Sequence, residues 1–329
     1  MDSMSGNSCI SVSALIAVYN PDLCFFEKAV ASVLTQTCPV LELVVVNDGG
    51  SEAFRSILPD DDRIRVFSKQ HEGVAATRNF ALQQCRGEYI AFLDQDDYWY
   101  PDKLHEQMAM IPLPSEPCMV TSPVDIVLSD DSILDTLSRQ VSEAYRWKTG
   151  QANAGLNLFE GNFIYSSTPL IHRAVFDKAG RFDPRVQPHD DWDIYLRIVL
   201  ASIPLYCYRE RPLSVWRSHA SNESNKGTKM MHSKCLVEKK LLETVMDDVT
   251  KGLLSTNLLI DFLERVNLLY KQNEYRRFRR LVKGYIFLLL RYKYHFRGVE
   301  VELRRAYSGR VRNIVLKSAR RYLVSCFLS

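Results

Sequence analysis

An apolar segment that ends in three carboxylates constrains the fold of this chain most. Tyr89–Leu93 is a run of apolar residues that predicts a buried strand, and Asp94, Asp96 and Asp97 follow it directly. Like charges at this spacing repel, so a positive group must offset them. A divalent cation suits such a site: carboxylate oxygens favour Mg²⁺ or Mn²⁺ over zinc, and substrate phosphates complete the coordination. The alternative is an acidic turn that caps a helix starting near Pro101.

The same pattern of an apolar strand followed by polar residues occurs twice more. The predicted elements are strand 12–18, helix 22–36, strand 41–46, strand 64–67, helix 73–84 and strand 89–93. Strands alternating with helices predict an α/β fold with a mostly parallel sheet, in which ligands bind at the carboxyl ends of the strands. Asn20, Asp48 and the aspartates 94–97 all fall at such ends. The first strand-to-helix turn lacks Gly-x-Gly-x-x-Gly, and the chain lacks a P-loop motif, which disfavours dinucleotide-binding Rossmann enzymes and P-loop proteins.

Two residues near these strand ends have competing interpretations. Asp48 is either a helix N-cap, the favoured interpretation for this residue alone, or a carboxylate that accepts the imide N–H of a pyrimidine base. Arg78 lies either on a solvated helix face or close to the aspartates and a diphosphate, whose charge it would offset. Its position just before the acidic strand supports the second interpretation.

The middle of the chain contains a second acidic cluster. Residues 112–150 are polar and predict an irregular connection, residues 164–171 predict a strand, and a helix is expected from Arg173 to Gly180. The segment 189–200, HDDWDIYLRIVL, has the spacing of an amphipathic helix that begins with Asp190 and Asp191. These carboxylates either complement the helix N-terminus or supply a general base for a substrate hydroxyl.

Six segments, in this order, resemble the inverting family 2 glycosyltransferases, which have the GT-A fold. They are VSALIAVYN, VVVNDGGS, GVAATRNFAL, the GEYIAFLDQDD stretch with its YW and PDKL, the Gly-x-Phe-Asp of GRFDP, and DDWDIYLR, spread over about residues 12–220. The resemblance implies a GT-A-like, Rossmann-type sheet flanked by helices, with a C-terminal helical extension. It implies a catalytic domain over residues 1–227 and a basic α-helical region over residues 228–329.

The resemblance also assigns roles to individual residues. Asp191 would be the catalytic base, with Asp190 beside it where the family commonly has Glu. The nucleotide-sugar site would comprise Tyr19, Asn20, Asp48, Arg78, Asp94, Gln95 and Asp96. Asp94-Gln95-Asp96 would be the D-x-D motif. The metal, Mn²⁺ or Mg²⁺, would be held by Asp96, Asp94 and His219, although His219 could equally be a surface histidine or a diphosphate contact.

The implied activity is metal-dependent, inverting transfer of a hexosyl or N-acetylhexosaminyl group. The donor would be a nucleotide-diphosphate sugar, most simply UDP-linked, and the acceptor a hydroxyl of a glycan or of a lipid-linked substrate of the bacterial cell-surface polysaccharide type. Paired carboxylates are also found in glycoside hydrolases, which is one alternative. A catalytically inactive module that binds sugar nucleotides is another, and the presence of Asp94, Asp96 and Asp191 counts against it.

The C-terminal part of the chain has the opposite charge to the rest. From Lys271 onward sixteen Lys and Arg face three Glu, a net charge of +13, whereas residues 1–270 carry −10. Basic residues flank the apolar runs 285–290 and 322–328, which are too short to span a bilayer but suit interfacial helices on anionic lipid. Packing on the catalytic domain is the alternative, and no nucleic-acid motif is present, so no nucleic-acid partner is expected. Scattered cysteines and the absence of a signal peptide predict a cytoplasmic location, with peripheral attachment to the inner face of the membrane.

Overall fold

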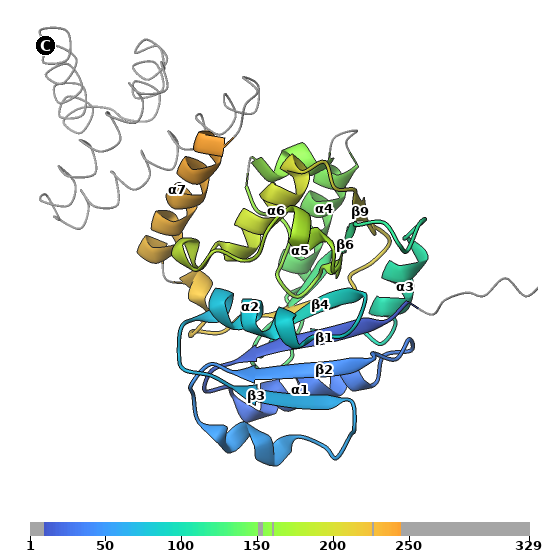
Figure 1. Ribbon diagram of the computed structural model, residues 1–329, viewed down its shortest axis with the longest axis vertical. Coiled ribbons are helices and arrows are strands. Elements are labelled where there is room, and N and C mark those ends of the chain that lie inside the picture. The colour runs from blue at the N-terminus through green and yellow to red at the C-terminus, as the bar shows by residue number, and fades with distance from the viewer. Residues whose placement is uncertain (1–9, 151–153, 160, 226, 245–329) are drawn as a thin grey trace, which may run out of the picture. The chain divides into compact units, whose positions relative to one another are not determined.

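A computed structural model describes residues 10–150, 154–159, 161–225 and 227–244 (Figure 1). The chain divides into two compact units, Met1–Lys226 and Gly227–Ser329. Within the second unit, the described residues are those of one helix, α7 (Gly227–Thr244). The expected helices beyond residue 244, with the apolar runs 285–290 and 322–328 and the basic residues that flank them, lie outside the described residues.

A seven-stranded mixed sheet forms the centre of the first unit (Figure 1). Its strands, in spatial order, are β3 (Ile64–Ser68), β2 (Glu42–Asn47), β1 (Val12–Val18), β4 (Tyr89–Asp94), β8 (Leu170–His172), β6 (Met119–Thr121) and β9 (Leu205–Cys207). The first four strands are mutually parallel, whereas β8 runs antiparallel to both β4 and β6. The parallel half therefore directs the carboxyl ends of β1, β2 and β4 to one edge.

Helices cover both faces of the parallel half, which explains its continuous apolar strands. Alternate residues of β1, from Val12 to Val18, pack with the buried residues of α1 (Leu23–Leu34) in one core cluster. Helix α2 (Val74–Gln84) contacts β1 and β2. Phe92 on β4 packs edge-to-face against Phe176 and Phe182, at the side of β4 opposite the residues that join the α1 cluster.

A second, three-stranded sheet supports the residues that follow β4. It has the order β5 (Tyr98–Trp99), β10 (Ser214–Arg217) and β7 (Val124–Val127). β10 pairs antiparallel with β5 and parallel with β7. Because β5 begins one residue after Asp97, this sheet brings the end of β10 beside the three aspartates.

The remaining helices of the first unit lie between and after these strands. They are α3 (Lys103–Ala109), α4 (Asp135–Thr149), α5 (Val175–Lys178), α6 (Asp190–Leu200) and the 3₁₀ turns η1 (Glu52–Ile57), η2 (Ala154–Phe159), η3 (Pro184–Val186) and η4 (Glu223–Asn225). Asp190 and Asp191 are the first two residues of α6, as the sequence predicts. In the described part of the chain, no helix is long and apolar enough to cross a bilayer.

Two sequence predictions about the middle of the chain are wrong. Residues 112–150 are not an irregular connection, because they contain β6, β7 and α4. The strand predicted over residues 164–171 is limited to β8, Leu170–His172. Residues 164–169 instead form a turn whose polar side chains bond to residues of the acidic strand end, and these tertiary contacts replace the strand pairing.

Candidate functional site

Arg78 joins the two acidic clusters, which are 93 positions or more apart in the sequence. Its Nη2 lies 2.7 Å from Oδ1 of Asp94 at the end of β4, and its Nη1 lies 3.0 Å from Oδ2 of Asp190 at the start of α6. The Arg78 side chain is only 7% exposed. Burial strengthens these ion pairs and makes an unpaired charge costly, so Arg78 fixes the strand end against the helix start.

Asp94 is held from its other side by a segment that the sequence did not identify. Ser166 donates a short hydrogen bond to Oδ2 of Asp94. The neighbouring Ser167 accepts a hydrogen bond from the Asp94 N–H at 3.0 Å and donates one to Oδ2 of Asp97 at 2.6 Å. Both oxygens of Asp94 therefore have partners within the chain, Arg78 and Ser166.

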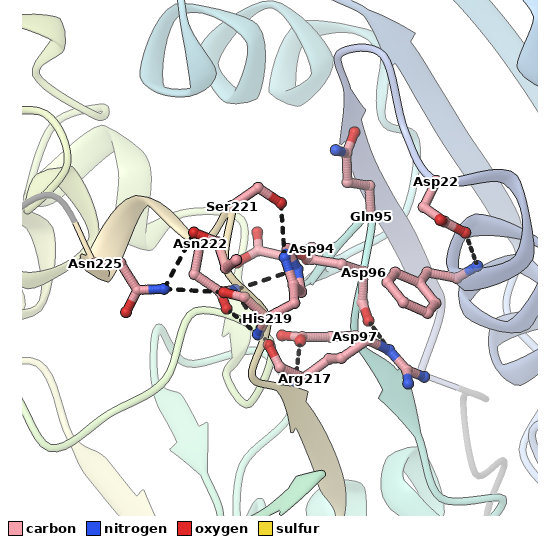
Figure 2. A network of polar contacts seen from close by, with 12 residues as sticks. Asp22, Asp94, Gln95, Asp96, Asp97, Arg217, His219, Ser221, Asn222 and Asn225 are labelled. Atoms are coloured by element: carbon pink, nitrogen blue, oxygen red, sulfur yellow. Dashed lines mark hydrogen bonds and ion pairs between the residues drawn. The ribbon is translucent and has the colours of Figure 1, made fainter. Parts of the chain in front are cut away.

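Asp96 faces an imidazole instead of a guanidinium. Nε2 of His219 lies 2.8 Å from Oδ2 of Asp96, and Nδ1 of the same ring lies 2.8 Å from Oγ of Ser221 (Figure 2). The loop carrying His219 is held by Asn222, whose Oδ1 accepts from the His219 N–H. Burial and the nearby charge of Asp94 raise the pKa of the Asp96 carboxyl above its ordinary value.

Asp97 and Arg217 fix the backbone of this acidic turn through hydrogen bonds. Asp97 is buried and its Oδ1 accepts the Arg217 N–H at 2.9 Å, while Nε of Arg217 donates to the Asp96 carbonyl at 3.0 Å (Figure 2). Nη2 of Arg217 binds Oδ1 of Asp131 at 2.7 Å. Burial, followed by the charges of Asp96 and Asp94, raises the pKa of Asp97 well above its ordinary value. Arg217 therefore fixes the backbone that presents Asp96.

The donor atoms at the acidic turn fit a divalent cation that keeps positions for substrate oxygens. Within the described ranges, no group of three or more His, Cys, Asp and Glu side chains forms a metal site. Asp96 and His219 do lie together, with Nε2 of the imidazole 2.8 Å from Oδ2 of the carboxylate. Mg²⁺ and Mn²⁺ sites commonly use one or two carboxylates and take their remaining oxygens from water or phosphate, so the pair suits such an ion.

The two carboxylates at the start of α6 have different surroundings. Asp190 is 1% exposed, and Arg78 is its cationic partner. Asp191 is partly exposed, with Oδ1 accepting the Trp192 N–H at 2.6 Å and Oδ2 accepting from Nδ2 of Asn162 at 3.3 Å. Burial and the charge of Asp190 raise the pKa of Asp191 to about 7. A carboxylate in this range can take a proton near neutral pH.

Asp48 is more deeply engaged than the sequence suggested. Its side chain is 5% exposed; Oδ1 accepts from Lys69 Nζ and the Glu72 N–H, and Oδ2 accepts from the Gly73 N–H. These bonds hold the loop before α2, whereas the following turn η1 is capped by Ser51. The carboxylate therefore secures the start of α2, and its capacity for a further partner is small.

The remaining predicted binding residues line the end of β1. Gln95 Oε1 accepts the Tyr19 N–H at 2.8 Å, so its amide is committed to the backbone. Asn20, which has a φ of 44°, accepts the Ser51 N–H at its Oδ1. The Tyr19 ring is 46% exposed and stacks on His71 at 4.3 Å. An exposed aromatic face beside Asp48 can stack on a planar ligand.

Part of this chain is similar in sequence to known glycosyltransferases. Residues 13–165 match the family described as Glycosyl transferase family 2. An uncharacterized glycosyltransferase of Rickettsia typhi is 28% identical over 195 residues, 58% of this chain and 59% of the relative. The putative teichuronic acid biosynthesis glycosyltransferase TuaG of Bacillus subtilis is 40% identical over 89 residues, 26% of this chain and 35% of the relative. The matched part of this chain therefore spans less than two thirds of each of these relatives.

Solved structures show the same fold. TarS 1–349 of S. aureus in complex with UDP-GlcNAc has a TM-score of 0.60 at 16% identity, over 84% of this chain and 80% of that one. The mannosyltransferase PcManGT of Pyrobaculum calidifontis, in complex with GDP-Man and Mn²⁺, has a TM-score of 0.59 at 14% identity, over 95% and 80%. The match to glycosyltransferase family 2 is thus confined to residues 13–165, and the likeness to these structures shows that the chain has the GT-A fold.

Proposed function

We propose that this chain is a metal-dependent inverting glycosyltransferase that moves a sugar from a UDP-sugar to a hydroxyl of a glycan or lipid-linked acceptor. The observation that carries this proposal is the pairing of Asp94 and Asp190 through Arg78, which brings a partly exposed carboxylate of pKa about 7, Asp191, close to the acidic turn. The proposed donor site and the proposed proton acceptor are thus linked through Arg78, which supports a single displacement at a sugar carbon.

The chain's own residues would act as follows. The acceptor hydroxyl gives its proton to Asp191 as its oxygen attacks the anomeric carbon from the face opposite the leaving nucleoside diphosphate. Asp190, held by Arg78, keeps the start of α6 in place and raises the proton affinity of Asp191. Configuration at the anomeric carbon inverts because there is one displacement and no covalent intermediate.

Asp96 and His219 would hold the divalent cation, Mn²⁺ or Mg²⁺. A bound cation supplies Lewis-acid stabilisation of the negative charge on the departing diphosphate. We assign Asp94 to orienting Arg78 and the sugar nucleotide, since both of its oxygens already have partners. Tyr19 would contribute a stacking face for the base, with Asp48 and Asn20 fixing the surrounding loops.

The choice of donor and acceptor class rests on the relatives. One similar structure holds UDP-GlcNAc and another holds GDP-Man and Mn²⁺, which supports a nucleotide-diphosphate sugar and, with TarS, an N-acetylhexosaminyl or other hexosyl group. The name of TuaG refers to teichuronic acid biosynthesis, which supports a cell-surface polysaccharide as the product. We place the enzyme in the cytoplasm, where nucleotide sugars are made.

Calorimetry with UDP in the presence and absence of Mn²⁺ tests this proposal. We expect UDP to bind and Mn²⁺ to strengthen the binding, because Asp96 and His219 would hold the cation, whose positive charge would offset the charge of the diphosphate. A glycoside hydrolase needs neither nucleotide nor metal, so absence of UDP binding under both conditions would favour that alternative. Binding without any sugar transfer or donor hydrolysis would instead favour the inactive module.

We further propose that the basic region after residue 270 attaches the enzyme to anionic membranes. Each Lys or Arg near an anionic surface contributes about 1 kcal/mol, and salt weakens this attraction. The full chain should co-sediment with anionic vesicles at low salt, and a chain ending at Asn267 should lose this binding while still hydrolysing the donor. A full-length protein that ignores such vesicles would make the basic region a packing or oligomerisation element.

A further inference from the structure

Among the described residues, Asn162 is the side chain that donates a hydrogen bond to Asp191. Its Nδ2 lies 3.3 Å from Oδ2 of Asp191, and its Oδ1 accepts the Ile164 N–H at 3.1 Å. The backbone bond fixes the orientation of the amide: with the oxygen committed to Ile164, the NH₂ group must face Asp191.

The two oxygens of Asp191 are therefore not equivalent. Oδ1 is held close to the chain by the Trp192 N–H at 2.6 Å. Oδ2 accepts one hydrogen bond from Asn162 and, as a carboxylate oxygen, keeps a further lone pair. Each oxygen accepts one hydrogen bond, but Oδ1 is bound to the backbone of its own helix at 2.6 Å, whereas Oδ2 is held less tightly, at 3.3 Å. We therefore take Oδ2 as the oxygen that receives the proton of a substrate hydroxyl, with Asn162 setting its direction.

We propose that Asn162 is the positioning residue for the Asp191 carboxylate, holding Oδ2 toward the acceptor hydroxyl and favouring the ionised form that accepts its proton. The inference rests on the proposed function of Asp191. The same segment of the chain contacts both acidic clusters. Ser166 and Ser167, four and five residues after Asn162, donate hydrogen bonds to Asp94 and Asp97.

The charged groups around Asp191 make the contribution of Asn162 measurable. On its own helix Asp191 faces Asp190 and Tyr195; from α2 it faces Arg78, and from β4 it faces Asp94. Asn162 is a neutral donor, so its removal changes none of these charges. A change in the titration of Asp191 in an Asn162 variant therefore reports the lost hydrogen bond.

The experiment compares wild type, Asn162→Ala and Asn162→Gln in Mn²⁺-dependent hydrolysis of UDP-GlcNAc across pH. A hydrogen bond donated to a carboxylate favours its ionised form, so Asn162→Ala should raise the pKa of Asp191 and move the acidic limb of the kcat–pH profile up by roughly one pH unit. We expect kcat at pH 7 to fall about fivefold, because a base of pKa about 7 that shifts by one unit goes from half ionised to about one tenth ionised at this pH. KM for the donor should stay within about twofold, and Asn162→Gln, which keeps the amide, should recover part of the shift.

Ser166→Ala is the matched control, since it removes a hydrogen bond to Asp94 from the same segment. We expect it to raise KM for the donor and leave the acidic limb in place. An Asn162→Ala enzyme with the wild-type limb and kcat would overturn the inference.

A second measurement does not depend on turnover. The Asp191 carboxyl resonance, in protein labelled with ¹³C-aspartate and assigned with Asp191→Asn, should titrate at higher pH in Asn162→Ala. If wild type hydrolyses no nucleotide sugar but this resonance shifts, the proposed function fails and the positioning role stands. An unshifted resonance refutes the positioning role, whatever the activity.

Discussion

Two regions contain clustered carboxylates that repel one another: the acidic turn, Asp94–Asp97, and the acidic helix start, Asp190–Asp191. The partners that offset this repulsion differ between the two. In each region one carboxylate, Asp94 or Asp190, is paired with Arg78. The other carboxylates considered for function have different partners: Asp96 faces the His219 imidazole, whereas Asp191, among the described residues, accepts N–H groups from Trp192 and Asn162. Arg78 connects the two regions because it pairs with a carboxylate in each. The other contacts differ, and on the proposed function Asp96 with His219 would bind a cation, whereas Asp191 would accept a proton.

Replacing Arg78 removes an ion pair from both regions at once and should cause the largest loss of stability. Arg78→Met leaves Asp190, which is 1% exposed, without a cationic partner. Removing one member of a buried pair costs about 3–5 kcal/mol, a large part of the stability of an ordinary domain. Urea unfolding measures this loss. Arg55→Met, which removes an exposed pair with Glu52, is the control, and equal losses for the two variants would contradict the bridging role.

Asp96→Ala breaks only the acidic turn. It removes a carboxylate from a site with few protein ligands, so we expect metal-dependent UDP binding and donor hydrolysis to be abolished while the helix start is untouched. Calorimetric titration of UDP with Mn²⁺ measures the loss, and Asp130→Ala, in an exposed turn that bonds Ser132, serves as the control. An Asp96→Ala protein with wild-type UDP affinity at every metal concentration would refute the assignment.

Asp191→Asn breaks only the helix start. The amide keeps the shape of the side chain but cannot take a proton, so the transfer rate should fall by roughly 10²–10⁴ fold while donor binding stays near normal. Steady-state kinetics with a calorimetric check of UDP affinity separates the two quantities. Full turnover in this variant would place the base elsewhere, with Asp190 as the next candidate.

The parallel half of the fold and the positions of the carboxylates were predictable from the sequence. Runs such as Leu43–Val46 are apolar throughout because helices cover both faces of the sheet, so they indicate strands without ambiguity. Asp94, Asp96, Asp190 and Asp191 were predictable because neighbouring carboxylates repel one another, so each cluster indicates a positive partner or a functional role.

The elements between residues 112 and 150 were harder to predict, because their hydrophobic patterns are too short or differ from the usual amphipathic pattern. β6 and β7 have three and four residues, too few for a periodic pattern. Helix α4 buries Ser138, Ser142 and Tyr145 and exposes Leu137 and Trp147, against the usual amphipathic pattern.

The supporting residues of the site were missed for a related reason. Asn162, Ser166 and Ser167 carry no sequence signal, because their roles depend on contacts with residues 29 to 73 positions away. One sequence feature argued against the predicted strand over residues 164–171: it contains three consecutive hydroxyl side chains, which is unusual for a buried strand.

The central claim is that the two acidic regions together break the bond between a sugar and a nucleoside diphosphate. The direct test is release of the nucleoside diphosphate from a panel of nucleotide sugars, with Mn²⁺, by wild type and Asp191→Asn. We expect wild type to release UDP from at least one UDP-sugar, with a chelator stopping the reaction and Asp191→Asn slowing it by roughly 10²–10⁴ fold. Wild-type protein that releases no nucleoside diphosphate from any donor, or releases it equally well without Asp191, would contradict the account.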